Sequence, residues 1–260
     1  MQSKYHWKRD YHDESAVYAH QVPAFKLLES TALPASADLT KFCSAVEDQG
    51  QLGSCTGNAL VGAMEYLENK SKEFEVKDKF VDLSRLFVYY NERNLEGTVK
   101  YDNGAQISDG VKTLATQGVC TEAAWPYAIH RFAVKPPATA YTDAATRKIT
   151  AYARVDRSNG IQGIKQALAS GYPIVFGFTV YESFESEEVA QSGVLNMPDT
   201  AHEQCMGGHA VLMVGYNDAT QRVKVRNSWG ADWGQGGYFT MPYAYVISPT
   251  LANDFWTLTK

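Results

Sequence analysis

The sequence predicts an α+β protein with two lobes, one mainly helical and one mainly β-stranded, and a cleft between them. Apolar residues recur at helical spacing over about residues 45–135, whereas short runs rich in β-branched and aromatic residues occur over about residues 145–250. A stretch rich in proline, alanine and threonine, KPPATAYTDAAT, separates the two patterns and is typical of a connection. Clefts between lobes are common places for ligand sites, so we expect the functional residues there.

Three helices are predicted in the first half of the chain. The first begins at Cys55 and continues to about Lys70, because its apolar residues lie three or four positions apart. Ser84 is a typical N-cap for the second helix. Ser108 is the expected N-cap of the third, which we expect to end at Gly118.

The second half opens with one more helix, around Ile164, and continues with three strand-like runs: YPIVFGFTVY, HAVLMVGY and RVKVRNSW. The polar residues NDAT between Tyr216 and Gln221 predict a hairpin that joins the last two runs. Residues at the outer ends of those two strands are therefore expected to meet.

Composition limits the classes of partner and site. The chain has 260 residues, of which 45% are hydrophobic and 20% charged, as in an ordinary soluble globular protein. A net charge of −5 gives no reason to expect nucleic acid or an anionic membrane as a partner, and no apolar run is long enough to span a bilayer. The first residues, MQSKYHWKRDYHDES, lack the apolar region of a secretory signal, and the compartment stays open. The four cysteines match no metal-binding spacing, so we expect no metal site. We also expect no cofactor and a monomer.

Cys55 stands where the polar stretch DQGQLGS gives way to a helix. The thiolate is the reactive form of cysteine, and the partial positive charge of a helix N-terminus favours it. Most free cysteines are instead small buried hydrophobic residues. A nucleophilic role therefore requires a nearby base and a group that orients the base.

Two later motifs supply such groups. His209 follows two glycines in GGHAVLMVGY, where the glycines leave room for a chain or substrate to approach. Asn227 ends the next predicted strand in RNSWGADWGQGGYF. Both residues lie at the outer end of the predicted hairpin, so we expect their side chains to meet.

Together with Gln49, these residues resemble the papain-like cysteine peptidases, because QGxxGSC, GGHAVxxVGY and NSWGxxWGxxGY all occur in that order. The resemblance extends from about Pro34 to the C-terminus and is greatest to the bacterial branch with a short N-terminal segment. It implies a papain-like two-lobe fold with a helical lobe and an antiparallel, β-barrel-like lobe. It also implies a peptidase domain over 34–260 and an N-terminal extension over 1–33.

The resemblance implies a role for each motif residue. Cys55 would be the nucleophile, and His209 would form the thiolate–imidazolium pair with it and protonate the leaving amine. Asn227 would hold the imidazole by accepting its other N–H. The Gln49 side chain and the Cys55 backbone N–H would form the oxyanion hole, and Trp229 would shield the Asn227–His209 hydrogen bond from water.

The resemblance also implies contacts with a protein or peptide substrate. Asn103, Gly104 and Ala105 resemble the segment that pairs with the substrate backbone, although the family more often has glycine in place of Ala105. Gly208 matches a position on the opposite wall of the cleft, and Phe178 is expected to contribute to the specificity pocket.

The chain departs from the family pattern around the nucleophile. Leu52 and Thr56 stand where the family has a cysteine and an aromatic residue. Asp102 occupies the position of the first cysteine's usual disulfide partner, so both members of that bridge are missing together. Cys43 and Cys120 flank the helical half and either form a disulfide or remain buried free thiols.

An insertion before His209, SFESEEVAQSGVLNMPDTAHEQCMGG, contains an acidic run. The run either forms a solvated face or a cleft-side patch that favours basic substrates, and solvation is the simpler interpretation. His202 and Cys205 with His209 resemble metal ligands only superficially, since HEQCM lacks the second histidine of HExxH. Residues 1–33 either lie across the cleft or brace the back of one lobe, and we favour the brace.

The leading hypothesis is a cysteine endopeptidase that hydrolyses peptide bonds through a thioester. One alternative is a hydrolase on the same fold that acts on a narrow amide or isopeptide substrate. Another is a binding module that has kept the fold without catalysis, against which the intact set of four motif residues argues.

Overall fold

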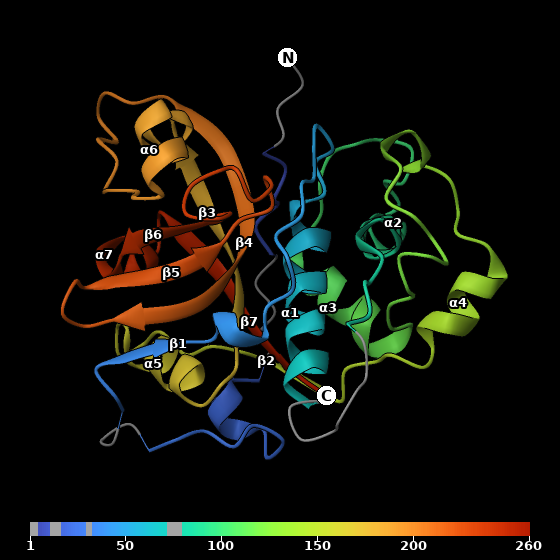
Figure 1. Cartoon of the computed structure of the whole chain (residues 1–260), viewed down its shortest axis with the longest axis horizontal. Coiled ribbons are helices and arrows are strands. Elements are labelled where there is room, and N and C mark those ends of the chain that lie inside the picture. The colour runs from blue at the N-terminus through green and yellow to red at the C-terminus, as the bar shows by residue number, and fades with distance from the viewer. Residues whose placement is uncertain (1–4, 11–16, 30–32, 72–79) are drawn as a thin grey trace.

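The computed structural model describes residues 5–10, 17–29, 33–71 and 80–260 (Figure 1). The helices are α1 (Cys55–Ser71), α2 (Arg85–Leu95), α3 (Ile107–Thr116), α4 (Ala138–Ala144), α5 (Gln162–Ala169), α6 (Glu187–Ser192) and α7 (Tyr243–Ile247). The strands are β1 (Ser36–Asp38), β2 (Ala151–Arg154), β3 (Ile174–Tyr181), β4 (Cys205–Asn217), β5 (Arg222–Arg226), β6 (Tyr238–Pro242) and β7 (Ala252–Thr259). Figure 1 shows α1–α4 on one side and most strands on the other, as the α+β prediction requires.

The helical lobe is built around α1, whose residues Cys55–Glu68 are all buried. Ser84 caps α2 as predicted, since its hydroxyl accepts the Phe87 backbone N–H at 3.1 Å. The prediction for α3 was wrong by two residues, because Gln106 is its N-cap. Ser108 lies in the first turn of α3, where its backbone N–H donates to the Asp10 carboxylate at 3.1 Å.

The β lobe is one antiparallel sheet with the strand order β2-β7-β3-β4-β5-β6, and β1 pairs with β4. The predicted hairpin is present as β4–β5, with Leu212 opposite Arg226. The expected barrel-like closure is absent among the described residues, because β2 and β6 remain at opposite edges of the sheet. No helix in the described part of the chain is long and apolar enough to cross a membrane.

A shared apolar core joins the two lobes. It brings together Leu60 and Met64 of α1, Leu212 of β4 and Trp256 of β7, which are all nearly inaccessible to solvent. This core holds the first turn of α1 against the outer end of β4. Burial of such side chains stabilises the fold by about 1.5–3 kcal/mol each, so the relative position of the lobes is well determined.

Candidate active site

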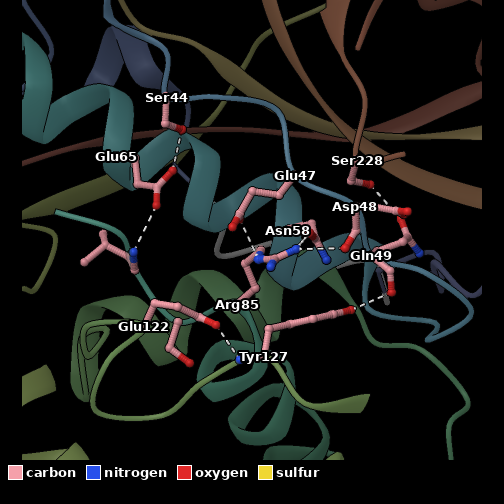
Figure 2. Close-up of polar contacts among 12 residues, drawn as sticks. Ser44, Glu47, Asp48, Gln49, Asn58, Glu65, Arg85, Glu122, Tyr127 and Ser228 are labelled. Atoms are coloured by element: carbon pink, nitrogen blue, oxygen red, sulfur yellow. Dashed lines mark hydrogen bonds and ion pairs between the residues drawn. The ribbon is translucent and has the colours of Figure 1, made fainter. Parts of the chain in front are cut away.

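Gln49 lies in a loop that is fastened to both lobes (Figure 2). Its side-chain oxygen accepts the Ser228 hydroxyl at 2.6 Å, and its amide nitrogen donates to the Leu52 carbonyl at 2.9 Å. Its backbone carbonyl accepts the Tyr127 hydroxyl at 2.8 Å. Because the Ser228 hydroxyl donates, the amide group has a fixed orientation, and its NH₂ retains a second N–H for another acceptor.

Arg85 of α2 holds the same loop from below (Figure 2). Its guanidinium lies 2.6 Å from the Glu47 carboxylate, 3.2 Å from the Asp48 carbonyl and 3.1 Å from the Asn58 side-chain oxygen. The guanidinium also stacks 4.0 Å from the centre of the Tyr127 ring. One buried cation therefore positions residues on both sides of Gln49, a role that no sequence motif indicated.

Cys55 begins α1 and is 0% exposed. Burial raises the pKa of its thiol to about 11, while backbone N–H groups of Ala210 and His6 act in the opposite direction. The helix N-terminus that the sequence predicted is present, but its effect on the thiol is outweighed by the loss of water. In this arrangement the thiol is protonated at neutral pH.

His209 on β4 and Asn227 directly after β5 meet as the hairpin predicts. The His209 Nε2 atom lies 2.8 Å from the Asn227 side-chain oxygen, and that oxygen also accepts the Ser228 backbone N–H at 2.9 Å. The backbone N–H of Ser228 identifies this Asn227 atom as the amide oxygen, which can only accept hydrogen bonds. The His209 Nε2 atom must therefore be the donor and carry the proton. The Trp229 ring stacks on the imidazole at 5.1 Å, with 27° between the ring planes.

Phe178 of β3 lies directly opposite His209 of β4 and is fully buried in the core of the β lobe. The two rings meet edge to face at 5.9 Å. In the described structure the Phe178 ring packs in the core of the β lobe, and its place in a specificity pocket stays a prediction.

The N-terminal segment Tyr5–Asp10 runs between α1 and β4 in Figure 1 and forms hydrogen bonds with both lobes, so it lies in the cleft between them. The Trp7 N–H donates to the Gly208 carbonyl of the β lobe at 2.9 Å, and the Lys8 N–H donates to the Ala105 carbonyl of the helical lobe at 3.0 Å. The Tyr5 ring lies 6.0 Å from the His209 ring. Residues 5–8 thus cover the cysteine and the histidine, which explains why both are buried.

This segment approaches several glycines of the cleft closely, and the approach is tightest at two of them. A side chain at Gly104 would clash with the His6 carbonyl, 1.6 Å from the added Cβ, and the φ of Gly104 is +68°. A side chain at Gly177 would clash with the Trp7 indole at 2.0 Å. Gly104 and Ala105 are buried under the segment, and Asn103 beside them is exposed.

Residues 1–33 were expected to brace the back of one lobe, but residues 5–10 lie in the cleft instead. Residues 17–29 do lie on the β lobe, where the Phe25 ring meets the Tyr172 ring edge to face at 5.1 Å. The stretch YHWKRD contains no periodicity or turn signal that would have placed it in the cleft. Residues 1–4, 11–16 and 30–32 lie outside the described residues.

Comparison with known protein families matches residues 33–249 to the papain family cysteine proteases. The chain belongs to that family. An uncharacterized peptidase C1-like protein of Acanthamoeba polyphaga mimivirus is 48% identical over 219 residues, which are 82% of this chain and 69% of that protein. A cathepsin B-like protein of Giardia intestinalis is 31% identical over 208 residues, 75% of this chain and 62% of that protein.

Solved structures show the same papain-like architecture. The crystal structure of xylellain, a cysteine protease from Xylella fastidiosa, matches with a TM-score of 0.88 and 39% identity over 100% of this chain and 97% of that one. Bromelain from Ananas comosus matches with a TM-score of 0.66 and 25% identity over 87% of this chain and 99% of that one. The bacterial resemblance predicted from the motifs agrees with the xylellain match.

This papain-family peptidase replaces the missing loop disulfide with hydrogen bonds. Both Asp102 carboxylate oxygens lie 3.1 Å from the Gly53 backbone N–H, and one accepts the Tyr89 hydroxyl at 2.5 Å. Thr56 donates to the fully buried Glu92 carboxylate at 2.7 Å, so a polar contact stands where the family has an aromatic side chain. At Asp102 and Thr56, where the chain departs from the family motif, side-chain hydrogen bonds hold the loop and the first turn of α1.

Cys43 and Cys120 do not form a disulfide, since all four cysteines of the peptidase are free. No group of residues in the described ranges is arranged to hold a metal ion. His202 is instead exposed, and its Nδ1 atom lies 2.7 Å from the Asp199 carboxylate.

Proposed function

We propose that this papain-family peptidase is an endopeptidase that cleaves peptide bonds of proteins through a thioester on Cys55. The observation that carries the proposal is the histidine geometry. The Asn227 oxygen lies 2.8 Å from Nε2 and holds the ring in one orientation, so we assign to Nδ1 the exchange of a proton with the thiol.

The reaction follows from these positions. The Cys55 thiolate attacks the carbonyl carbon of the substrate, and the oxygen gains negative charge that the Gln49 side-chain N–H and the Cys55 backbone N–H stabilise. The His209 imidazolium then gives its proton to the leaving amine, and the C–N bond breaks to leave a thioester. Water, deprotonated by His209, attacks the thioester and releases the acid and the free thiol.

Two neighbours support the machinery without touching the reacting atoms. Ser228 orients the Gln49 amide through the 2.6 Å hydrogen bond, which also joins the two lobes across the cleft. Trp229 excludes water from one face of the imidazole, so the His209–Asn227 hydrogen bond meets less competition.

The described chain corresponds to a blocked state of this enzyme. Residues 5–8 occupy the space that a substrate backbone needs, since they use the carbonyls of Gly208 and Ala105 as acceptors. We propose that the segment must leave before a protein substrate can enter. Water would then reach Cys55, and the thiol pKa would fall from its buried value because desolvation is the largest cause of the shift.

Active-site labelling combined with a general protease assay tests this function. The full-length protein is treated with an epoxide thiol reagent, mapped by mass spectrometry, and assayed on denatured casein. We expect one adduct at Cys55, loss of that adduct in His209→Ala, and no casein cleavage by Cys55→Ala. An adduct without casein cleavage would indicate a hydrolase of narrow amide specificity. An adduct that forms in Trp7→Ala but not in the wild type would indicate that residues 5–8 act as a latch, and the absence of any adduct in both proteins would indicate a binding module.

A further inference from the structure

We infer that the cavity beside Trp229 is a subsite for a basic side chain of the substrate residue that follows the cleaved bond. This inference rests on the proposed peptidase function and adds a substrate preference to it. The cavity has a volume of about 460 Å³, and its walls include Asp48, Glu185, Trp229 and Trp233. We call it the Trp229 cavity.

The position of the cavity follows from the segment that lies in the cleft. Lys8 pairs with Ala105, His6 lies against Gly53 next to the nucleophile, and Tyr5 reaches Glu185 with its hydroxyl at 2.6 Å. The Trp229 cavity is therefore at the opposite end of the cleft from Ala105. If the acyl part of a substrate pairs with Ala105, as the family resemblance implies, the leaving part enters the Trp229 cavity.

The charge of the cavity selects a cation. Asp48 comes from the Gln49 loop and Glu185 from the turn after β3, so two carboxylates approach from different lobes. No lysine, arginine or histidine is among the residues that line the cavity. Both carboxylates belong to exposed residues, and each accepts an uncharged donor: the Gly50 N–H for Asp48 and the Tyr5 hydroxyl for Glu185. Among the described residues, an entering guanidinium or ammonium therefore displaces no cation from either carboxylate.

The aromatic walls add a second attraction for the same ligand. Trp229 and Trp233 meet nearly perpendicularly, with ring centres 5.2 Å apart and 83° between the planes. A cation over the face of an indole gains about 0.5–1 kcal/mol at an exposed site, and its aliphatic stem packs on the ring. A glutamate or aspartate side chain would gain neither contact and would be repelled by both carboxylates.

The segment in the cleft already shows how Glu185 is used. Its carboxylate accepts a hydrogen bond from Tyr5, a residue of a peptide lying across the nucleophile. The remaining glutamates of the acidic run do not line the cavity: Glu182, Glu187 and Glu188. The Glu182 carboxylate accepts the Gln204 backbone N–H, and the Glu187 carboxylate accepts the Gln191 side-chain amide N–H. Within the acidic run, Glu185 therefore lines the cavity and the other glutamates form a solvated face.

The test uses a set of peptides that share one acyl side and differ only in the residue after the cleaved bond, which is arginine, lysine, glutamine or glutamate. The value of kcat/KM is measured for the full-length protein, for Glu185→Gln, and for Glu188→Gln as the matched control from the same acidic run. Exposed ion pairs and cation–π contacts together predict an arginine-to-glutamine ratio of about three to ten. Glu185→Gln should reduce the ratio to about two or less, and Glu188→Gln should leave it unchanged.

The ratio is insensitive to how tightly residues 5–10 are held, because a change in cleft access affects all peptides of the set equally. Raising the salt concentration should lower the ratio in the wild type, and should lower it less in Glu185→Gln, where Asp48 is the remaining carboxylate. Equal cleavage of all four peptides, or the same loss in both variants, would overturn the subsite and leave the peptidase function standing. Failure to cleave any peptide, together with no adduct at Cys55 in either the wild type or the opened variant Trp7→Ala, would overturn both.

Discussion

Replacing Trp7 with alanine should open the cleft. The indole packs against the core shared by the lobes, where it lies over Gly177 and Gly208, and its nitrogen has no hydrogen-bond partner among the described residues. Removing the ring therefore costs apolar contact and no hydrogen bond. The backbone N–H that donates to the Gly208 carbonyl is unchanged by the substitution.

The size of the effect follows from the burial of the ring. Truncating a fully buried tryptophan costs about 3–5 kcal/mol, and Trp7 is half-buried, so we expect about 2 kcal/mol. The closed state of the segment loses this energy, and the fraction of open molecules rises by about thirtyfold. If labelling occurs only in the open state, the labelling rate of Cys55 rises by the same factor.

The assay is the second-order rate of Cys55 modification by an epoxide thiol reagent, read by mass spectrometry on the intact chain. Leu28→Ala is the matched control, since Leu28 lies in the same N-terminal region, is 44% exposed and does not contact the cleft. Circular dichroism should show that both variants remain folded. A Trp7→Ala rate within twofold of the wild-type rate would refute the argument that residues 5–8 restrict access to the thiol.

Three further outcomes follow from the site. Gln49→Ala should lower kcat about 10²–10³-fold with little change in KM, because it removes one oxyanion donor. Asp102→Ala should lower the melting temperature by about 2–10 °C, since the buried Gly53 N–H loses its acceptor. Burial raises the pKa of Glu92 to about 8, so this carboxyl keeps its proton in the fold over a pH range in which it ionises in the unfolded chain. Stability should therefore fall from pH 5 to pH 8, and Glu92→Gln should reduce that fall in melting temperature by about 5 °C.

Each of these outcomes has a clear contrary result. Wild-type turnover by Gln49→Ala would place the oxyanion elsewhere. A melting temperature of Asp102→Ala equal to that of the wild type would mean that the loop is held without the carboxylate. An unchanged pH dependence in Glu92→Gln, measured by differential scanning fluorimetry at both pH values, would assign the effect to Glu47 and Glu65, whose pKa values are also raised by burial, each to about 7.

The elements that the sequence predicted well are those set by local chemistry. The N-cap at Ser84 and the β4–β5 hairpin depend on residues within a few positions of one another, and both are present. The hairpin then brought His209 to Asn227, so their meeting also followed from local information. The catalytic roles of these residues stay a prediction until the labelling is done.

Contacts between distant segments were not predictable in the same way. Phe178 was expected in a specificity pocket; the structure pairs it with His209 and packs its ring in the core of the β lobe, and its role in a pocket stays a prediction. This pairing depends on the register of β3 against β4, which alternation alone does not define. Cys43 and Cys120 were left open and are free, since only the distance between their positions in the fold decides whether a disulfide forms.

The sequence by itself determined the family of this protein, its two-lobe architecture and the meeting of His209 with Asn227, because those depend on short motifs in a given order. The tertiary structure decided that residues 5–10 cover the nucleophile, that Asp102 replaces a disulfide and that Glu185 alone of its acidic run faces the cleft. The physical reason is that these contacts join residues far apart in the chain. The N-terminal segment binds where glycines allow close approach and where backbone carbonyls accept its N–H groups, and local sequence propensity does not predict such a binding position.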